Sequence, residues 1–335
     1  MKRTMKILLL FATFLCAADA FAQGDSLLVV SWNVENFLNP RTDTTGRHTA
    51  SRLRNKCNAI SKTLLLIAGQ YGRLPDAVAL MEVGDRYVLE RLLNYTPLRK
   101  LDYAIVHFDS PDRRGIDCAL LYRRSTLKLV SASPKHLYDS NGAVMRTRDI
   151  LLAEFDALDI LVNHHPSKVG ISSEGRRAVA MDRLRWLMDS LAAVPSKNSP
   201  VFLDGRPQIA QPSKKTPYFL DGSAVTGSER RILAVGDFND DLWKDGSPGT
   251  IKYNGAWEKI DGFFARGPIS VRESVFNHPL LSEEDKKYGG TKPRRSFSGP
   301  RYLGGVSDHY PLVLRIMIAD ATSNPRSSAA APVGH

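Results

Sequence analysis

Short apolar runs that end in polar or acidic residues recur along the whole sequence. Eight of them have the length and composition of buried strands: residues 27–31, 77–81, 103–108, 116–122, 150–155, 160–163, 232–235 and 312–316. Two longer segments, 50–70 and 174–191, instead repeat apolar residues at helical spacing. Strands and helices therefore alternate irregularly, which predicts an α/β fold with strand pairs at 103–122 and 150–163.

The most informative run ends in the string VGDFND at 235–240, whose Val235 is the last of four apolar residues that begin at Ile232. Residues two apart in an extended chain point to the same side, so Asp237 and Asn239 are expected to aim at one point. A carboxylate beside an amide can hold a water molecule and a phosphate oxygen. The alternative interpretation is a strand that simply runs into an Asx turn.

Four further strings have the same form, an apolar run that ends in polar residues. They are SWNVEN at 31–36, ALMEV at 79–83, VNHHPS at 162–167 and SDHYP at 307–311. In order and spacing, the five strings resemble the endonuclease/exonuclease/phosphatase superfamily of deoxyribonuclease-like and AP-endonuclease-like phosphoesterases, from about residue 29 to 314. The resemblance implies a four-layer α/β sandwich, in which two packed mixed β-sheets are flanked by helices.

The same strings predict a binding site for a divalent metal ion. A carboxylate at the end of an apolar strand is costly to bury unless it is paired or bound to a cation, and Glu82 has this position. The resemblance implies that Glu82 is the principal metal ligand, with Asn33 and Asp308 beside it and Glu35 as a further candidate. Oxygen ligands without paired cysteines or histidines favour Mg²⁺ or Mn²⁺ over Zn²⁺. The alternative for Glu82 is a side chain that merely emerges at the surface.

The catalytic residues are expected among the same strand ends. The resemblance implies that Asp237 orients or deprotonates the attacking water and that Asn239 helps to hold it. His309 is expected to contact the phosphate oxygens, with Asp261 or Asp308 orienting such a histidine. His164 is the candidate to stabilise the phosphate or protonate the leaving oxygen.

Five arginines are candidates for substrate binding, because the planar guanidinium suits phosphate oxygens. They are Arg114, Arg148, Arg176, Arg294 and Arg295. Arg114 has an alternative as a surface ion pair with Asp117, which would contribute little. The loop before Asp308 is rich in glycine and basic residues, and a plain surface loop is the alternative there.

The chain begins with a pattern typical of a secretory signal peptide, residues 1–22, with cleavage expected after Ala22. Its removal takes away three cations and one acid, so the formal net charge falls from +11 to +9. The remainder predicts one domain at 23–320 with an insertion at 193–229, and a disordered tail at 321–335. The expected protein is periplasmic or secreted, monomeric and without a transmembrane segment.

Two cysteines remain, Cys57 and Cys118, and both read as small buried apolar residues. The sequence leaves open whether a disulfide joins them, because export would permit one. The expected function is hydrolysis of a phosphodiester by a metal-dependent exported nuclease, because a basic surface attracts nucleic acid. A secreted lipid or sugar phosphodiesterase or phosphatase is the alternative, and a catalytically inactive binding protein of the same fold is the third.

Overall fold

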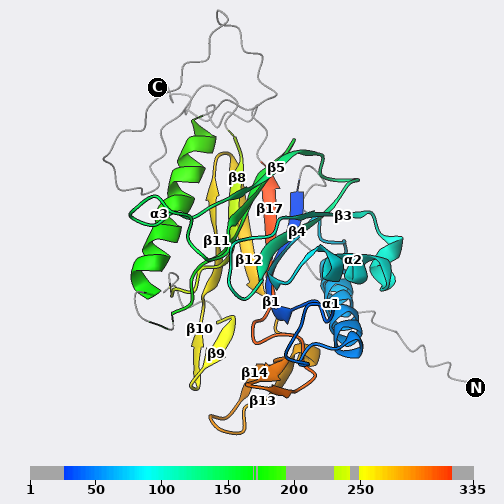
Figure 1. The fold of residues 1–335 in the computed structure, drawn as a ribbon. Helices are drawn as coiled ribbons and strands as arrows, with labels where there is room; N and C mark the ends of the chain where they lie inside the picture. Colours follow the sequence, from blue (N-terminus) through cyan, green and yellow to red (C-terminus); the bar gives the residue numbers. More distant parts are fainter. Residues whose placement is uncertain (1–25, 169, 171–172, 194–229, 242–248, 319–335) are drawn as a thin grey trace, which may run out of the picture.

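The computed structural model describes residues 26–168, 170, 173–193, 230–241 and 249–318 (Figure 1). The predicted signal peptide at 1–22 and the predicted tail at 321–335 lie outside the described residues. The predicted insertion does as well, except for residue 193.

The first large sheet has six strands in the order β12-β17-β1-β2-β4-β3. β1 and β2 are parallel, and the other neighbours are antiparallel, so the sheet is mixed. The bounds are β1 Ser26–Phe37, β2 Ala77–Val83, β3 Tyr103–His107, β4 Asp117–Arg123, β12 Ile269–Val275 and β17 Leu312–Ile318. The first strand is longer than the sequence predicts and continues through Asn33 and Glu35.

The second large sheet has five strands in the order β11-β8-β7-β6-β5, with only β7 and β8 parallel. The bounds are β5 Leu129–Lys135, β6 Ile150–Phe155, β7 Asp159–His164, β8 Ile232–Asp237 and β11 Asp261–Arg266. Both predicted strand pairs are confirmed, as β3 with β4 and β6 with β7. β5 has no counterpart in the sequence prediction, because its residues are only partly buried or exposed.

Alternating side chains of the strands fill three apolar layers. Val29 and Ala79 of one sheet pack with Val162 and Val235 of the other. The opposite face of the first sheet packs against helices α1 (Ala50–Tyr71) and α2 (Arg86–Asn94). The outer face of the second sheet packs against α3 (Ser173–Ala192). The order helix, sheet, sheet, helix confirms the predicted four-layer sandwich (Figure 1).

Short elements surround one end of the two sheets, on the side where β9/β10 and β13/β14 project in Figure 1. They are β9 Ile251–Tyr253, β10 Ala256–Glu258, η2 Pro279–Leu281, β13 Ser282–Glu284, β14 Thr291–Pro293, β15 Phe297–Ser298 and β16 Arg301–Tyr302. One more short helix, η1 Pro97–Lys100, connects α2 to β3. The β15–β16 pair belongs to the predicted glycine-rich basic loop.

The two cysteines are free and buried, on opposite sides of the first sheet. Cys57 packs in the cluster under α1, whereas Cys118 packs between the sheets. Both therefore fill apolar space, as the sequence predicts, and no disulfide joins them. None of the helices in the described part of the chain is long and apolar enough to cross a membrane.

Candidate active site

A glycine brings the end of β8 close to its neighbour. Gly236 has φ +150°, and a Cβ built there would lie 1.9 Å from the carbonyl oxygen of Asn163 on β7. Only glycine tolerates both this conformation and this approach. The close contact places Asp237 beside the end of β7, where it pairs in register with His164.

Asp237 is buried at the point where the two sheets meet, with 2% of its surface exposed. Its Oδ2 accepts a hydrogen bond from Asn33 Nδ2 of β1, 3.0 Å away, and its Oδ1 accepts from the backbone N–H of Asn239 at 2.9 Å. Burial raises the pKa of Asp237 to about 7, and the charge of Asp261 adds to the rise. Asn239 itself has φ +51°, so the backbone turns sharply there and the Asx-turn interpretation is correct. The extended-chain expectation is not, because Asn239 Nδ2 donates to the His165 carbonyl at 3.0 Å.

His309 is oriented by a buried carboxylate. Its Nδ1 lies 2.7 Å from Asp261 Oδ2, the same oxygen that accepts a hydrogen bond from Thr250 Oγ1 at 2.6 Å. The other ring nitrogen, Nε2, lies 3.9 Å from Asp237 Oδ2. Burial lowers the pKa of His309, but the charge and hydrogen bond of Asp261 outweigh burial and hold it well above its usual range. His309 is therefore a cation that faces Asp237.

His164 faces Asp237 from the other side, with Nε2 3.7 Å from Asp237 Oδ2. Burial lowers the pKa of His164 well below its usual range, and the charges of Arg148 and Arg114 act in the same direction. This imidazole is therefore neutral, in contrast to His309. Two histidines in different protonation states thus flank one carboxylate.

The predicted metal residues lie around this carboxylate at neighbouring strand ends. Glu82 has φ +63°, and its Oε2 accepts from the backbone N–H of Asn36 at 2.8 Å. Asp308 Oδ1 lies 3.9 Å from His309 Nε2, and its Oδ2 accepts from Arg295 Nη2 at 2.8 Å. The Asn33 amide spans the set, because its Nδ2 binds Asp237 while its Oδ1 accepts from the Glu35 N–H.

The carboxylate of Glu35 is surrounded by hydrogen-bond donors of the protein, which is not the environment of a metal ligand. Its carboxylate accepts hydrogen bonds from the backbone N–H groups of Ser296 at 2.5 Å and Phe297 at 3.3 Å, and Arg295 Nε lies 3.4 Å away. All of these donors belong to the loop at 294–306. Glu35 therefore anchors this loop to the end of β1, a role that the sequence interpretation did not include.

The arginines predicted to bind substrate divide into two groups. Arg114, Arg176, Arg294 and Arg295 all carry exposed surface. Arg114 Nη1 lies 3.7 Å from Glu82 Oε1. Arg148 differs, because it is buried and donates to the backbone oxygens of His164 and His165 and to Asp112. It positions the end of β7 and has no surface to offer a substrate.

Arg177 also lies near the site, although it is not among the five arginines predicted to bind substrate. Its Nε is 3.8 Å from Asp240 Oδ2, and its Nη1 donates to the Ser167 carbonyl. It therefore connects the first turn of α3 to the loop after Asp237. Arg176 is exposed on the same turn.

Lys56 is a further residue of the site that the sequence analysis missed. It is 8% exposed on α1, and its ammonium donates to the Glu35 carbonyl at 2.7 Å, to Ser296 Oγ at 2.5 Å and to the Val306 carbonyl. The signal available in the sequence is its place beside Leu53, Cys57 and Ile60 on the apolar side of the helix. A lysine there is unusual unless it has buried partners.

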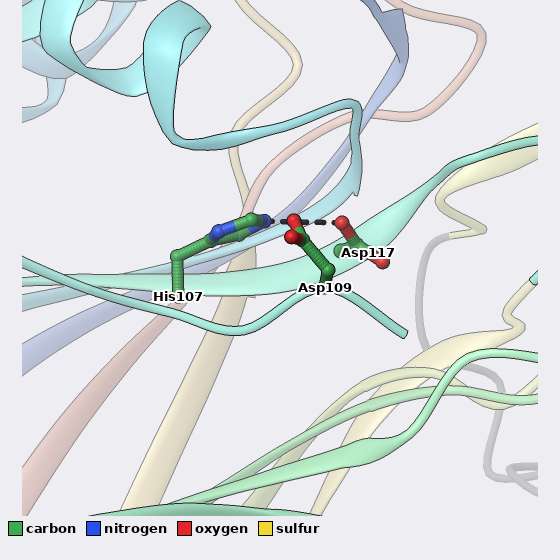
Figure 2. A group of neighbouring side chains, drawn as sticks. All are labelled: His107, Asp109 and Asp117. Carbon is green, nitrogen blue, oxygen red and sulfur yellow. Dashed lines mark hydrogen bonds and ion pairs between the residues drawn. The ribbon is translucent and has the colours of Figure 1, made fainter. Parts of the chain in front are cut away.

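Two groups of side chains among the described residues have metal-binding geometry. One is Asp237, Asp261 and His309, whose ligand atoms lie within 4.8 Å of one another. The other is His107, Asp109 and Asp117, which Figure 2 shows at the β3–β4 connection. There His107 Nε2 lies 3.1 Å from Asp117 Oδ2, while Asp117 Oδ1 accepts from the Ser110 N–H at 2.9 Å. This second group fixes the turn that carries Arg114.

Solved structures with the same fold have low sequence identity to this chain. TDP2 of D. rerio, humanised by 14 mutations, is 14% identical with a TM-score of 0.51, over 87% of this chain and 98% of that one. SmcL is 18% identical with a TM-score of 0.51, over 87% and 98%. TDP2 of C. elegans is 15% identical with a TM-score of 0.50, over 87% and 75%. These similarities establish the fold alone.

No curated protein sequence matches this chain significantly. The sequence profile of the endonuclease/exonuclease/phosphatase family, in contrast, matches residues 32–318. That range begins at the strand of Asn33 and ends in β17, so it includes every strand end that contributes to the site. The chain therefore belongs to the endonuclease/exonuclease/phosphatase family.

Proposed function

We propose that the protein is an exported, divalent-metal-dependent phosphodiesterase that cleaves nucleic acid. One observation carries this proposal: the buried side chain of Asp237, held by the side-chain amide of Asn33 and the backbone N–H of Asn239, lies between the imidazoles of His309 and His164, 3.9 Å and 3.7 Å away. Hydrolysis of a phosphodiester needs a group that positions water, donors for the phosphoryl oxygens and help for the leaving oxygen. These side chains supply one of each.

The donor set fits a hard divalent cation. Glu82, Asp308 and Asn33 offer carboxylate and amide oxygens, the ligands that Mg²⁺ and Mn²⁺ prefer. The side chains of Glu82 and Asp308 are 13% and 24% exposed, so an ion can reach them from solvent. A bound ion would polarise the phosphoryl oxygens and offset charge that develops in the transition state.

The protein side chains then have separate tasks. Asp237 orients the attacking water and accepts its proton, because Asn33 and Asn239 fix both carboxylate oxygens in place. His309 donates from Nε2 to a phosphoryl oxygen, while Asp261 stabilises its charge. His164 is neutral, so it donates one ring N–H toward the leaving oxygen of the phosphate rather than acting as a cation.

Nucleic acid is the substrate class that the surrounding surface favours. Exposed Arg114, Arg294 and Arg295 surround the site, and the whole chain has a formal net charge of +11. A hollow beside Asn36 is lined by the guanidinium of Arg52, the imidazole of His48 and the rings of Phe297 and Tyr302. Cationic and aromatic side chains together suit a polynucleotide, because its bases stack on the rings and its phosphates pair with the cations.

A panel of substrates tests the proposal. The mature chain is mixed with plasmid DNA, RNA, sphingomyelin and bis(4-nitrophenyl) phosphate, each with Mg²⁺ and with EDTA, and Asp237→Asn serves as the inactive control. Metal-dependent cleavage of DNA or RNA supports the proposal. Cleavage of sphingomyelin instead of nucleic acid would show that the substrate is a lipid phosphodiester. Export is tested separately, by the mass of the mature amino terminus, which cleavage after Ala22 places at Gln23.

A further inference from the structure

Thr250 contacts the carboxylate that orients His309. Its Oγ1 donates a hydrogen bond to Asp261 Oδ2 at 2.6 Å, and Nδ1 of His309 lies 2.7 Å from the same oxygen. All three residues are buried, with 0%, 1% and 5% of their surface exposed. A threonine hydroxyl and an imidazole of the candidate site therefore share one carboxylate oxygen in the interior of the protein.

The second oxygen of this carboxylate, Asp261 Oδ1, is buried and has no hydrogen-bond partner within the described residues. The terminal torsion of an aspartate side chain has broad energy minima, so hydrogen bonds decide how the carboxylate is turned. In the described structure, Thr250 and His309 supply these bonds. Without the hydroxyl of Thr250, the carboxylate would be held only by the histidine that it has to orient.

The backbone of Thr250 is fixed on two sides. Its N–H donates to the Glu258 carbonyl at 2.9 Å, which closes the β9–β10 hairpin, and its carbonyl accepts from the Tyr310 N–H at 2.8 Å. The next residue, Ile251, forms an isolated β-bridge with His309. The backbone that carries the hydroxyl is thus joined directly to the segment that carries the histidine.

We propose that Thr250 is a positioning residue of the hydrolytic reaction: its hydroxyl fixes the carboxylate of Asp261, and Asp261 in turn keeps Nε2 of His309 directed at the reacting phosphate. This inference rests on the proposed function. The physical reason is that rates fall steeply when a group that contacts the reacting atoms is displaced by even a small distance. Thr250 itself does not touch the substrate, since it is fully buried behind Asp261 and His309.

Two substitutions separate this role from a purely structural one. Thr250→Val keeps the shape of the side chain and removes the hydrogen-bond donor, whereas Thr250→Ser removes a methyl group and keeps the donor. If the hydroxyl positions His309, kcat of the Val variant should fall by about 10- to 100-fold and the Ser variant should stay near the wild type. KM should change by less than about twofold, because the contact of His309 with the phosphoryl oxygen strengthens in the transition state.

The experiment measures kcat, KM and the thermal midpoint of the mature chain with Mg²⁺ and the phosphodiester that the wild type cleaves fastest. Thr63→Val is the matched control, because Thr63 is also buried and its Oγ1 donates to the Ala59 carbonyl at 2.9 Å within α1. It should lower the thermal midpoint at most and leave kcat unchanged. If Thr250→Val does not fold, Thr250→Ala replaces it and is compared with Thr250→Ser, which differs from it by the hydroxyl alone.

A crystal structure of Thr250→Val provides a readout that does not depend on activity. It should show the Asp261 carboxylate turned away from its wild-type orientation, with the His309 ring displaced. An unchanged Asp261 and His309 in this variant would contradict the inference.

Three kinetic results also overturn the inference. They are a folded Thr250→Val protein with wild-type kcat, a change in KM alone, and a Thr250→Ser protein that loses as much kcat as Thr250→Val. In each case the wild type still cleaves its substrate, so the proposed function stands. A wild type that hydrolyses no phosphoester overturns the proposed function, and the inference falls with it.

Discussion

Asn33 and Asp237 join the two large sheets through one hydrogen bond, 3.0 Å from Nδ2 to Oδ2. Asn33 belongs to β1 of the first sheet and Asp237 ends β8 of the second. Both side chains are buried, with 2% of each residue exposed. The contact fixes the orientation of the carboxylate, and it makes the geometry of the site depend on how the sheets pack.

Asp237→Asn should abolish most turnover while the protein stays folded. The substitution keeps the shape of the side chain but removes the negative charge and the proton acceptor. We expect kcat to fall by about 10²–10⁴-fold, the range for general acid–base assistance. Rates and thermal midpoints should be measured together, with Asp241→Asn as an exposed control nearby. Near-normal turnover by a folded, metal-loaded Asp237→Asn protein would show that Asp237 is not the catalytic carboxylate.

Glu82→Gln should weaken the binding of a divalent ion. The amide keeps a similar size, so the fold should persist, but it removes a charged oxygen ligand. Mn²⁺ calorimetry should show at least tenfold weaker binding, and EDTA should abolish wild-type activity until Mg²⁺ or Mn²⁺ is restored. Glu90→Gln removes an exposed carboxylate of α2 and provides the control. Equal affinities for the two variants would exclude Glu82 as a ligand.

Replacing Arg294 and Arg295 by alanine should reduce the salt dependence of DNA binding. Each arginine that neutralises a phosphate releases about one counterion, so the slope of log affinity against log salt should fall by roughly 1–2. Fluorescence anisotropy with a labelled oligonucleotide, at several salt concentrations, measures the slope. Arg185→Ala, on the exposed face of α3, should leave it unchanged. If the loop variant also keeps the wild-type slope, the loop is not part of the binding surface.

His165 should contribute to acid instability. Its ring packs edge-on against Phe238 at 5.0 Å and its Nε2 has no hydrogen-bond partner within the described structure. Burial lowers the pKa of His165 from 6.5 to about 3, with help from the charge of Arg148. The folded state therefore prefers the neutral ring. Its stabilising contribution is complete above pH 6.5 and is lost progressively as the pH falls toward about 3.

His165→Phe removes this titration and keeps the aromatic contact with Phe238. Each pH unit inside the window is worth about 1.4 kcal/mol at most. Between pH 7 and pH 5 the variant should therefore lose roughly 2 kcal/mol less stability than the wild type. Urea unfolding at the two pH values measures this difference. Identical losses in both proteins would mean that His165 accepts a proton in the folded state as readily as in the unfolded state.

The sequence predicted the parts of the site whose chemistry is local to a strand end. Asn33, Glu82 and Asp237 each follow an apolar run, and a polar side chain there must lie at an edge of the sheet. Their residue types and order were enough to indicate the family and the four layers. The sequence analysis expected Asp261 or Asp308 to orient His309, and the structure has Asp261 in this role, 2.7 Å from Nδ1.

The parts that the sequence could not predict depend on partners far away in the chain. The sequence places Lys56 on the apolar side of α1 but does not indicate its partners, since two of its three acceptors are 240 and 250 residues distant. Glu35 has the residue type of a ligand, but the amides that bind it belong to a loop 261 residues away. Arg148 and Arg177 differ in how deeply their side chains are buried and in the direction in which these side chains point. The local sequence pattern predicts neither property.

The packing of β17 against β1 has a consequence for the timing of activity. β1 lies between β2 and β17, so the strand that carries Asn33 completes its pairing only with the last strand of the described chain. Asp308 and His309 immediately precede that strand. During synthesis, a chain that lacks this segment has neither residue and has an open edge on β1. A growing chain therefore cannot assemble the complete proposed site until synthesis has passed β17.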